Sequence, residues 1–172
     1  SLISGGLDSP VASYRMFKRG CSIVFVHFYN NTLTNPKVKT KVMDLVKSLS
    51  KYQSQTKIYF VPFADVQREI IAHVKDEYRM IIYRRYMFKI AEKILLKENA
   101  LAFVTGDSLA QVASQTLENI NVIYDSANYP VLAPLIGENK VDIVKEAKEI
   151  GTYDTSIRPY DDCCSFMVAQ HP

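Results

Sequence analysis

The chain has 172 residues, a net charge of +3, and 48% hydrophobic and 23% charged residues. These values are typical of one ordinary globular domain, and we treat residues 1–172 as a single domain. They exclude a disordered tail, a collagen-like fibre and a low-complexity arm. The apolar runs are too short to span a membrane, and the modest positive charge permits nucleic-acid binding without arguing for it.

Strand-like and helix-like segments alternate along the chain. In chain order we predict a strand end at 1–3, a helix at 9–18, a strand at 22–28, a helix at 35–50, a strand at 57–62, helices at 66–75 and 83–97, a strand at 101–105, a helix at 109–117, a strand at 131–135 and a helix at 141–150, followed by a loop-like tail from 153 to 172. This alternation predicts an α/β fold: a doubly wound, mostly parallel five-stranded sheet with helices on both faces. Such sheets bind ligands at the carboxyl ends of their strands.

The strongest local signal is the segment Ser4-Gly5-Gly6-Leu7-Asp8-Ser9-Pro10, which lies between a strand end and a helix start. Gly5 and Gly6 allow positive φ and close backbone approach, and Ser9 is a good N-cap before Pro10. Main-chain N–H groups at a helix N-terminus favour phosphate, and Mg²⁺ would reconcile Asp8 with such an anion. An ordinary capped turn is the plain alternative.

The pattern S-G-G-x-D-S resembles the PP-loop of the ATP pyrophosphatases, which split ATP between its α and β phosphates. Three further segments narrow the resemblance: 105–116, which follows a predicted strand; 132–137 with Asn139-Lys140; and Tyr160-Asp161-Asp162-Cys163-Cys164. In this order they resemble the ThiI family of tRNA 4-thiouridine synthetases over nearly the whole chain.

The resemblance implies an ATP-dependent tRNA sulfurtransferase of the cytoplasm, which adenylates uridine O4, releases pyrophosphate and then replaces that oxygen with sulfur. ATP and Mg²⁺ would be needed, and a cysteine desulfurase would donate the sulfur as a persulfide. Family members usually carry N-terminal RNA-binding domains, which we do not expect within residues 1–172. The chain also starts at Ser1 without a methionine, so we expect a piece of a longer protein. A homodimer and a role in thiamine synthesis are compatible with the resemblance.

The resemblance also assigns roles to residues. Asp8 would act with Mg²⁺ and pyrophosphate, Lys140 would stand beside it, and Cys164 would carry sulfur. Nucleotide would contact the loop, the end of the second strand, Gly106 and the polar helix that follows; the candidates are Ser4, Gly5, Gly6, Leu7, Asp8, Ser9, His27, Phe28, Gly106 and Gln115. For His27 a satisfied core histidine, and for Gln111, Ser114 and Gln115 a merely polar helix face, are the competing interpretations.

The cysteines support a reducing compartment. Cys21, Cys163 and Cys164 are an odd number without C-x-x-C spacing, so we predict no disulfide framework, zinc site or iron–sulfur cluster. Because Cys163 and Cys164 are adjacent, the sulfur carrier could be Cys163 instead of Cys164. Asp161 and Asp162 would raise a neighbouring thiol pKa if they lay close.

Lysines at 37, 39, 41 and 47 and a second basic group that includes Arg84 and Arg85 are interpreted as solvated helix faces or as a surface for the tRNA backbone. We slightly favour phosphate contacts for Arg84 and Arg85. Two other functions stay open. One is a different PP-loop enzyme, either a 2-thiouridylase or an amide-forming synthetase; the other is a nucleotide-binding module without catalysis.

Overall fold

The computed structural model describes residues 1–32 and 37–159. Its strands form two parallel pairs. β1 (Val24–Tyr29) pairs with β2 (Lys57–Pro62), and β3 (Phe103–Val104) pairs with β4 (Val131–Leu132). The main chain of residues 1–3 lies between the pairs, because the Leu2 N–H donates to Val104 O and the Ile3 N–H donates to Val26 O, both at 2.9 Å.

The predicted strand directions are confirmed, but the continuous five-stranded sheet is not. The predicted strands 101–105 and 131–135 shrink to two residues each. Leu101 is 82% exposed, so it does not extend β3 into the core. Pro134 has no N–H to donate, which limits the second strand.

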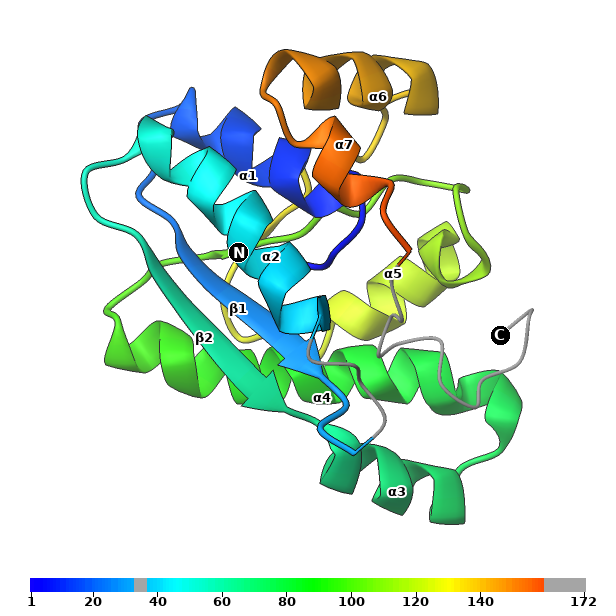
Figure 1. Cartoon of the computed structure of the whole chain (residues 1–172). Coiled ribbons are helices and arrows are strands. Elements are labelled where there is room, and N and C mark those ends of the chain that lie inside the picture. The colour runs from blue at the N-terminus through cyan, green and yellow to red at the C-terminus, as the bar shows by residue number, and fades with distance from the viewer. Residues whose placement is uncertain (33–36, 160–172) are drawn as a thin grey trace.

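Helices cover both faces of the strands, as predicted (Figure 1). Figure 1 shows α1, α6 and α7 above the strands and α3 and α4 below them. The bounds are α1 (Asp8–Phe17), α2 (Lys37–Leu49), α3 (Ala64–His73), α4 (Asp76–Lys97), α5 (Leu117–Tyr124), α6 (Lys140–Glu149) and α7 (Tyr153–Ser156), with 3₁₀ turns η1 (Ser50–Tyr52) and η2 (Ala113–Gln115).

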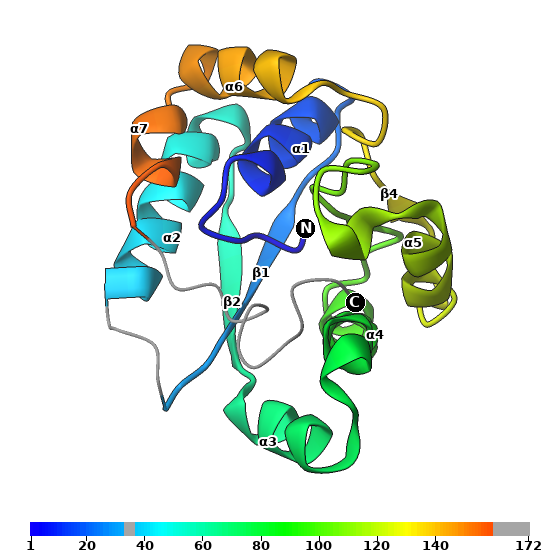
Figure 2. The ribbon, with the colours of Figure 1, turned by 90° about the vertical axis from the view of Figure 1, so that its right-hand side faces the viewer.

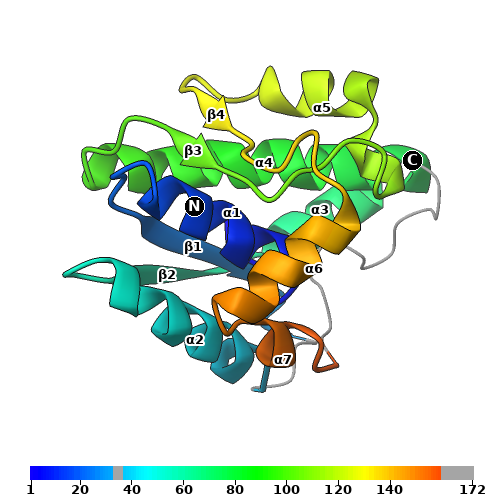
Figure 3. The ribbon, with the colours of Figure 1, turned by 90° about the horizontal axis from the view of Figure 1, so that it is seen from above.

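Two hydrophobic cores follow from the alternation of side chains along the strands. Phe25 and Val104 face the core under α1, α2 and α6, whereas Val26, Phe28 and Phe103 face the core against α3, α4 and α5. The view from above separates the layers, with α1 and α6 on the near side of the strands and α4 beyond them (Figure 3). Burial on both faces suits the mainly apolar β1 and β3, whereas β2 and β4 are only partly buried.

Two helix predictions need correction. The predicted helix 109–117 is wrong, because that stretch contains only η2, and the next helix begins at Leu117. Thr116 is its N-cap and accepts a hydrogen bond from the Asn119 N–H at 3.2 Å, which fixes the later start. The segment from 153, predicted as loop, begins with α7.

Candidate functional site

Two serines brace the loop at residues 4–9. The Ser4 N–H donates to Ser9 Oγ at 2.9 Å, and the Gly6 N–H donates to Ser4 Oγ at 3.2 Å. The prediction that Ser9 caps the helix is therefore wrong: α1 begins at Asp8, and its N-cap Leu7 makes no side-chain cap. Because no capping side chain covers it, this helix start keeps main-chain N–H groups available for an anion.

The glycines of the loop do not use a left-handed conformation. In the described part of the chain the glycines with positive φ are Gly20 and Gly151, so Gly5 and Gly6 do not use the positive φ that glycine allows. A Cβ on Gly6 would lie 3.4 Å from Ser4 Oγ, an ordinary contact. Their use for close approach to a ligand stays a prediction.

Lys140 and Asp8 meet beside this loop. The Lys140 Nζ donates to Asp8 Oδ1 at 2.5 Å, although the two residues are 132 positions apart. Their side chains are 48% and 27% exposed, so the pair remains open to a ligand. A lysine that begins a helix opposes the helix dipole, and the Asp8 carboxylate offsets that penalty. The structure thus brings together two of the three predicted catalytic residues.

Arg15, on α1, binds the segment that precedes Lys140 and also the helix α6 that Lys140 begins. Its guanidinium donates to Pro134 O at 3.0 Å, to Glu138 Oε1 at 2.7 Å and to Glu146 Oε2 at 2.8 Å. The hydrogen bond to Glu138 raises the pKa of Arg15, and the same bond lowers the pKa of Glu138. Sequence analysis missed Arg15; its seven-residue spacing from Asp8, two helical turns, was the available signal.

Gly106 touches the loop itself. A Cβ at this position would lie 2.7 Å from Ser9 N and 2.9 Å from the main-chain carbon of Asp8. Gly106 was predicted to let the backbone approach a nucleotide. In the structure its lack of a side chain already serves a different contact, between the end of β3 and the start of α1.

Asp107, the residue after Gly106, belongs to a buried network of charged and polar side chains. Asp107, 4% exposed, pairs with Arg84 Nη2 at 2.6 Å and accepts a hydrogen bond from the Tyr124 hydroxyl at 2.8 Å. Burial would raise the pKa of Asp107, but the Arg84 guanidinium and the Tyr124 hydrogen bond outweigh it and hold that pKa below its ordinary value. Burial and the nearby carboxylate raise the pKa of Tyr124. Arg84 is thus held by a buried carboxylate rather than on a solvated face, and its slightly favoured contact with phosphate stays a prediction.

Replacing Asp107 by asparagine should destabilise the protein by about 3–5 kcal/mol at pH 7, because a buried guanidinium would then face a neutral amide. The depressed pKa means that the pair stabilises the fold above the unfolded value of about 4 and loses this effect as pH falls through the folded pKa. Urea unfolding of both proteins at pH 7 and near pH 3 should therefore show the difference shrinking in acid.

Asp125→Asn is the matched control, since Asp125 pairs with the neighbouring Arg85 at 3.3 Å but its side chain is 74% exposed. It should cost at most about 1 kcal/mol at either pH. Equal losses in the two variants would contradict the special importance of the buried pair.

Gln115 contacts the same network. Its Nε2 donates to Asp107 Oδ1 at 3.3 Å, and its Oε1 is buried without a hydrogen-bond partner among the residues that the structure describes. Gln111 instead donates to Ser108 Oγ at 2.9 Å. Gln115 therefore stays a candidate for nucleotide contact, placed at the end of the 3₁₀ turn η2 rather than on the predicted helix.

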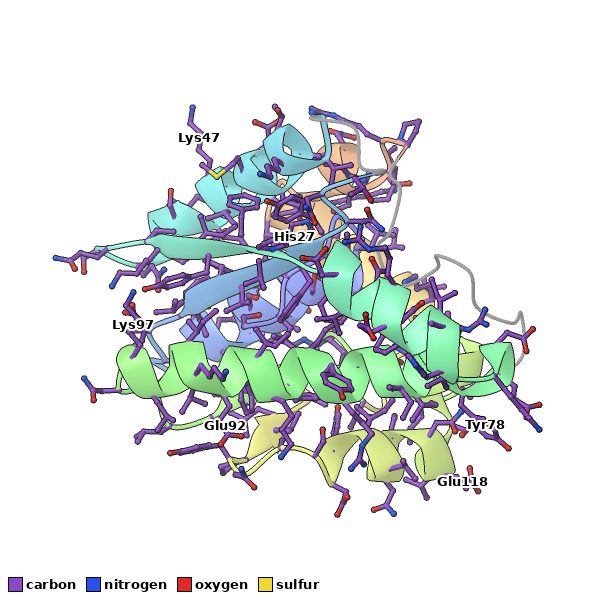
Figure 4. All side chains as sticks on the ribbon, turned by 90° about the horizontal axis from the view of Figure 1, so that it is seen from below. His27, Lys47, Tyr78, Glu92, Lys97 and Glu118 are labelled. Atoms are coloured by element: carbon purple, nitrogen blue, oxygen red, sulfur yellow. The ribbon has the colours of Figure 1, made fainter. Side chains whose placement is uncertain are left out.

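The two candidates at the end of the second strand have buried side chains. His27 is 1% exposed, and its Nδ1 lies 2.8 Å from Ile3 O (Figure 4). Phe28 is 5% exposed and packs edge-on against Phe63. Both side chains belong to the interior, so a nucleotide contact there would have to use the main chain; it stays a prediction.

The predictions for the cysteines and for the remaining basic residues have different outcomes. Cys163, Cys164, Asp161 and Asp162 lie outside the described residues, and Cys21 is a partly buried free thiol. Arg85 donates to Val122 O and pairs with Asp125. Lys41, taken as part of a solvated basic face, is 5% exposed.

Within residues 1–32 and 37–159, no helix is long and apolar enough to cross a membrane. The same residues contain no group of three or more His, Cys, Asp or Glu side chains placed to hold a metal ion.

Parallel strands covered on both faces, with a serine–glycine loop that opens a helix between them, define an α/β domain of the PP-loop synthetase class. The family model described as "Thiamine biosynthesis protein (ThiI)" matches residues 1–172, and the chain belongs to this family.

Two similar proteins at more than 40% identity and one more distant structure match the chain. The probable tRNA sulfurtransferase of Thermus thermophilus is 48% identical over 172 residues, all of this chain and 42% of that protein. A crystal structure of a 4-thiouridine synthetase–RNA complex with bound ATP has a TM-score of 0.94 at 43% identity, covering 99% of this chain and 45% of that chain. The NMN synthetase of Francisella tularensis, with a TM-score of 0.67 at 11% identity over 99% of this chain and 67% of its own, shares the fold alone. The chain thus spans less than half the length of the first two.

Proposed function

We propose that this chain is the catalytic domain of an ATP-dependent tRNA sulfurtransferase that converts a uridine to 4-thiouridine. The observation that carries the proposal is the Asp8–Lys140 pair beside the loop at 4–9. Family membership and the 43% identical synthetase with bound ATP support it.

The chemistry begins with a poor leaving group, the O4 oxygen of uridine. O4 attacks the α-phosphorus of ATP, the bond between the α-phosphorus and the bridging oxygen breaks, and pyrophosphate departs. Negative charge develops on the phosphates during this step, so N–H groups and an ammonium aimed at them lower the barrier. The helix start at Asp8 supplies N–H groups, and Lys140 supplies the ammonium.

Mg²⁺ suits this site in part. Its preferred ligands are oxygens, and Asp8 contributes one carboxylate that the phosphates would complement. When bound, the ion would neutralise phosphate charge. The ion pair at 2.5 Å shows that Lys140 can also reach this carboxylate, so it would share Asp8 with the ion.

Sulfur transfer completes the proposed reaction. A cysteine desulfurase would leave a persulfide on Cys164. Its terminal sulfur attacks C4 of the adenylated uridine, and AMP departs with the former O4. A second thiol then attacks the Sγ of Cys164, forms a disulfide with it and leaves the outer sulfur on C4. A thiolate is the useful form of the carrier at the first transfer.

Cys164→Ala should leave tRNA-dependent pyrophosphate release within about twofold of the original rate, because Cys164 is not needed to activate O4, and should abolish 4-thiouridine formation. Both products are measured in the complete gene product with ATP, tRNA and a persulfide donor. Cys163→Ala is the matched control, and thiolation should survive it.

Other outcomes assign other functions. Thiolation lost at Cys163 alone would move the carrier by one residue. Pyrophosphate release with sulfur at C2, or with an amide product, would indicate a 2-thiouridylase or an amide-forming synthetase. ATP binding without pyrophosphate release would leave a nucleotide-binding module.

The proposed partners are tRNA and a cysteine desulfurase. The family description supports a further link to thiamine biosynthesis. A cytoplasmic location and a homodimer stay predictions.

A further inference from the structure

A buried lysine joins α2 to the end of α7. Lys41 is 5% exposed, and its Nζ donates to Ser156 O at 2.9 Å and to Arg158 O at 2.7 Å. The last carbonyl of a helix has no partner within the helix, so the bond to Ser156 O satisfies a group that α7 itself leaves open, and the bond to Arg158 O holds the main chain two residues beyond the helix. The ammonium therefore holds the main chain of this stretch.

Two more contacts fix the same stretch. Arg158 Nη1 pairs with Asp44 Oδ2 of α2 at 3.1 Å, and Ser156 Oγ donates to Gly6 O at 3.2 Å. The end of α7 is thus held by α2 and also by the loop at 4–9. Figure 2 shows α7 against the upper part of α2, with the loop leading into α1 beside them.

This arrangement buries the Lys41 ammonium, and burial disfavours its charged form. Burial lowers the pKa of Lys41, and the positive charge of Arg158 lowers it further. An apolar side chain of similar length would fill the space without that penalty. The ammonium contributes two main-chain hydrogen bonds that such a side chain could not make.

The position of Lys41 matters because the proposed sulfur carrier comes shortly after the stretch that it holds. Pro159 ends the described segment, five positions before Cys164. At about 3.5 Å per extended residue, Cys164 stays within about 18 Å of Pro159 whatever path the chain takes. The place where Arg158 and Pro159 are held therefore limits which part of the site the thiol can reach.

We propose that Lys41 is a positioning residue for sulfur transfer: by fixing the main chain of Ser156 and Arg158, it sets the point from which the segment bearing Cys164 departs beside the loop at 4–9. This inference rests on the proposed function. It separates the two half-reactions, because pyrophosphate release needs the loop and Lys140 but not the reach of Cys164.

Lys41→Met in the complete gene product should lower the single-turnover rate of 4-thiouridine formation about tenfold or more, while pyrophosphate release stays within about twofold, since small displacements of a reacting group cost large factors in rate. Lys47→Met is the matched control. It makes the same change on the same helix at a lysine that points into solvent (Figure 4), and should alter neither rate.

Two further variants guard against a folding defect. Lys41→Arg keeps a donor and should recover part of the sulfur-transfer rate. Arg158→Met removes the exposed tie to Asp44 and should lower sulfur transfer in the same direction, by less. Excess free sulfide, a diffusible nucleophile that needs no tether, should restore 4-thiouridine in Lys41→Met.

The outcomes separate the two proposals. Equal loss of both rates in Lys41→Met, or no loss of either, would overturn the positioning role. Failure of sulfide to restore the product would also overturn it. An original protein that releases no pyrophosphate with tRNA would instead overturn the proposed function.

Discussion

Replacing Lys140 by methionine should slow tRNA-dependent pyrophosphate release by a factor of about 10²–10³, the usual cost of losing one preorganised donor to developing negative charge. The lysine ammonium lies 2.5 Å from Asp8 Oδ1 at the mouth of the loop, where the departing phosphates would collect charge. Methionine keeps the length and packing of the side chain and removes the charge alone.

The same variant should hardly change stability. The Lys140 side chain is 48% exposed, and ion pairs at such positions contribute about 0–1 kcal/mol. Thermal unfolding should therefore coincide for the two proteins, while calorimetric titration of ATP with Mg²⁺ shows weaker binding. Lys145→Met, at a position on the same helix, should change none of these measurements.

A contrary result would be informative. If Lys140→Met and Lys145→Met released pyrophosphate equally fast, the Asp8–Lys140 contact would be a surface ion pair only. If Lys140→Met lost stability and activity together, the lysine would act through the packing of α6.

Local patterns predicted much of the fold. The alternation of apolar runs placed the parallel strands and most helices, because strands covered by helices are mainly apolar. The loop at 4–9 was found because several unusual residues stand together between a strand and a helix. The pairing of Lys140 with Asp8 came from family resemblance, since no local pattern joins residues 132 positions apart.

Local patterns missed the residues whose surroundings are determined by partners far away in the sequence. Arg84 and Lys41 were assigned to solvated faces or to an RNA-binding surface. In the structure Arg84 pairs with a buried carboxylate, and the buried Lys41 donates to two main-chain carbonyls. Lys41 did carry a signal, because it falls on the stripe of Val38, Val42 and Leu45 that faces the core. The helix expected at 109–117 failed because Thr116 provides a stronger start and because Asp107 turns into its buried network.

Gly106→Ala should damage the site through a single methyl group. Its Cβ would lie 2.7–2.9 Å from main-chain atoms of Asp8 and Ser9, which cannot rotate away as a side chain could. Either the end of β3 or the start of α1 must move. Such overpacking costs about 1–3 kcal/mol of stability, and a displacement of the loop near 1 Å would slow pyrophosphate release about 10²-fold.

Gly137→Ala separates this clash from the general effect of replacing a glycine. A Cβ on Gly137 meets no heavy atom within 4 Å, so this variant should unfold at the same urea concentration as the original protein or slightly higher, since alanine restricts the unfolded chain. Urea unfolding and pyrophosphate release are measured on all three proteins. Normal release by Gly106→Ala would mean that the loop tolerates the shift, and the close contact with Asp8 and Ser9 would then be packing without a role in holding ATP.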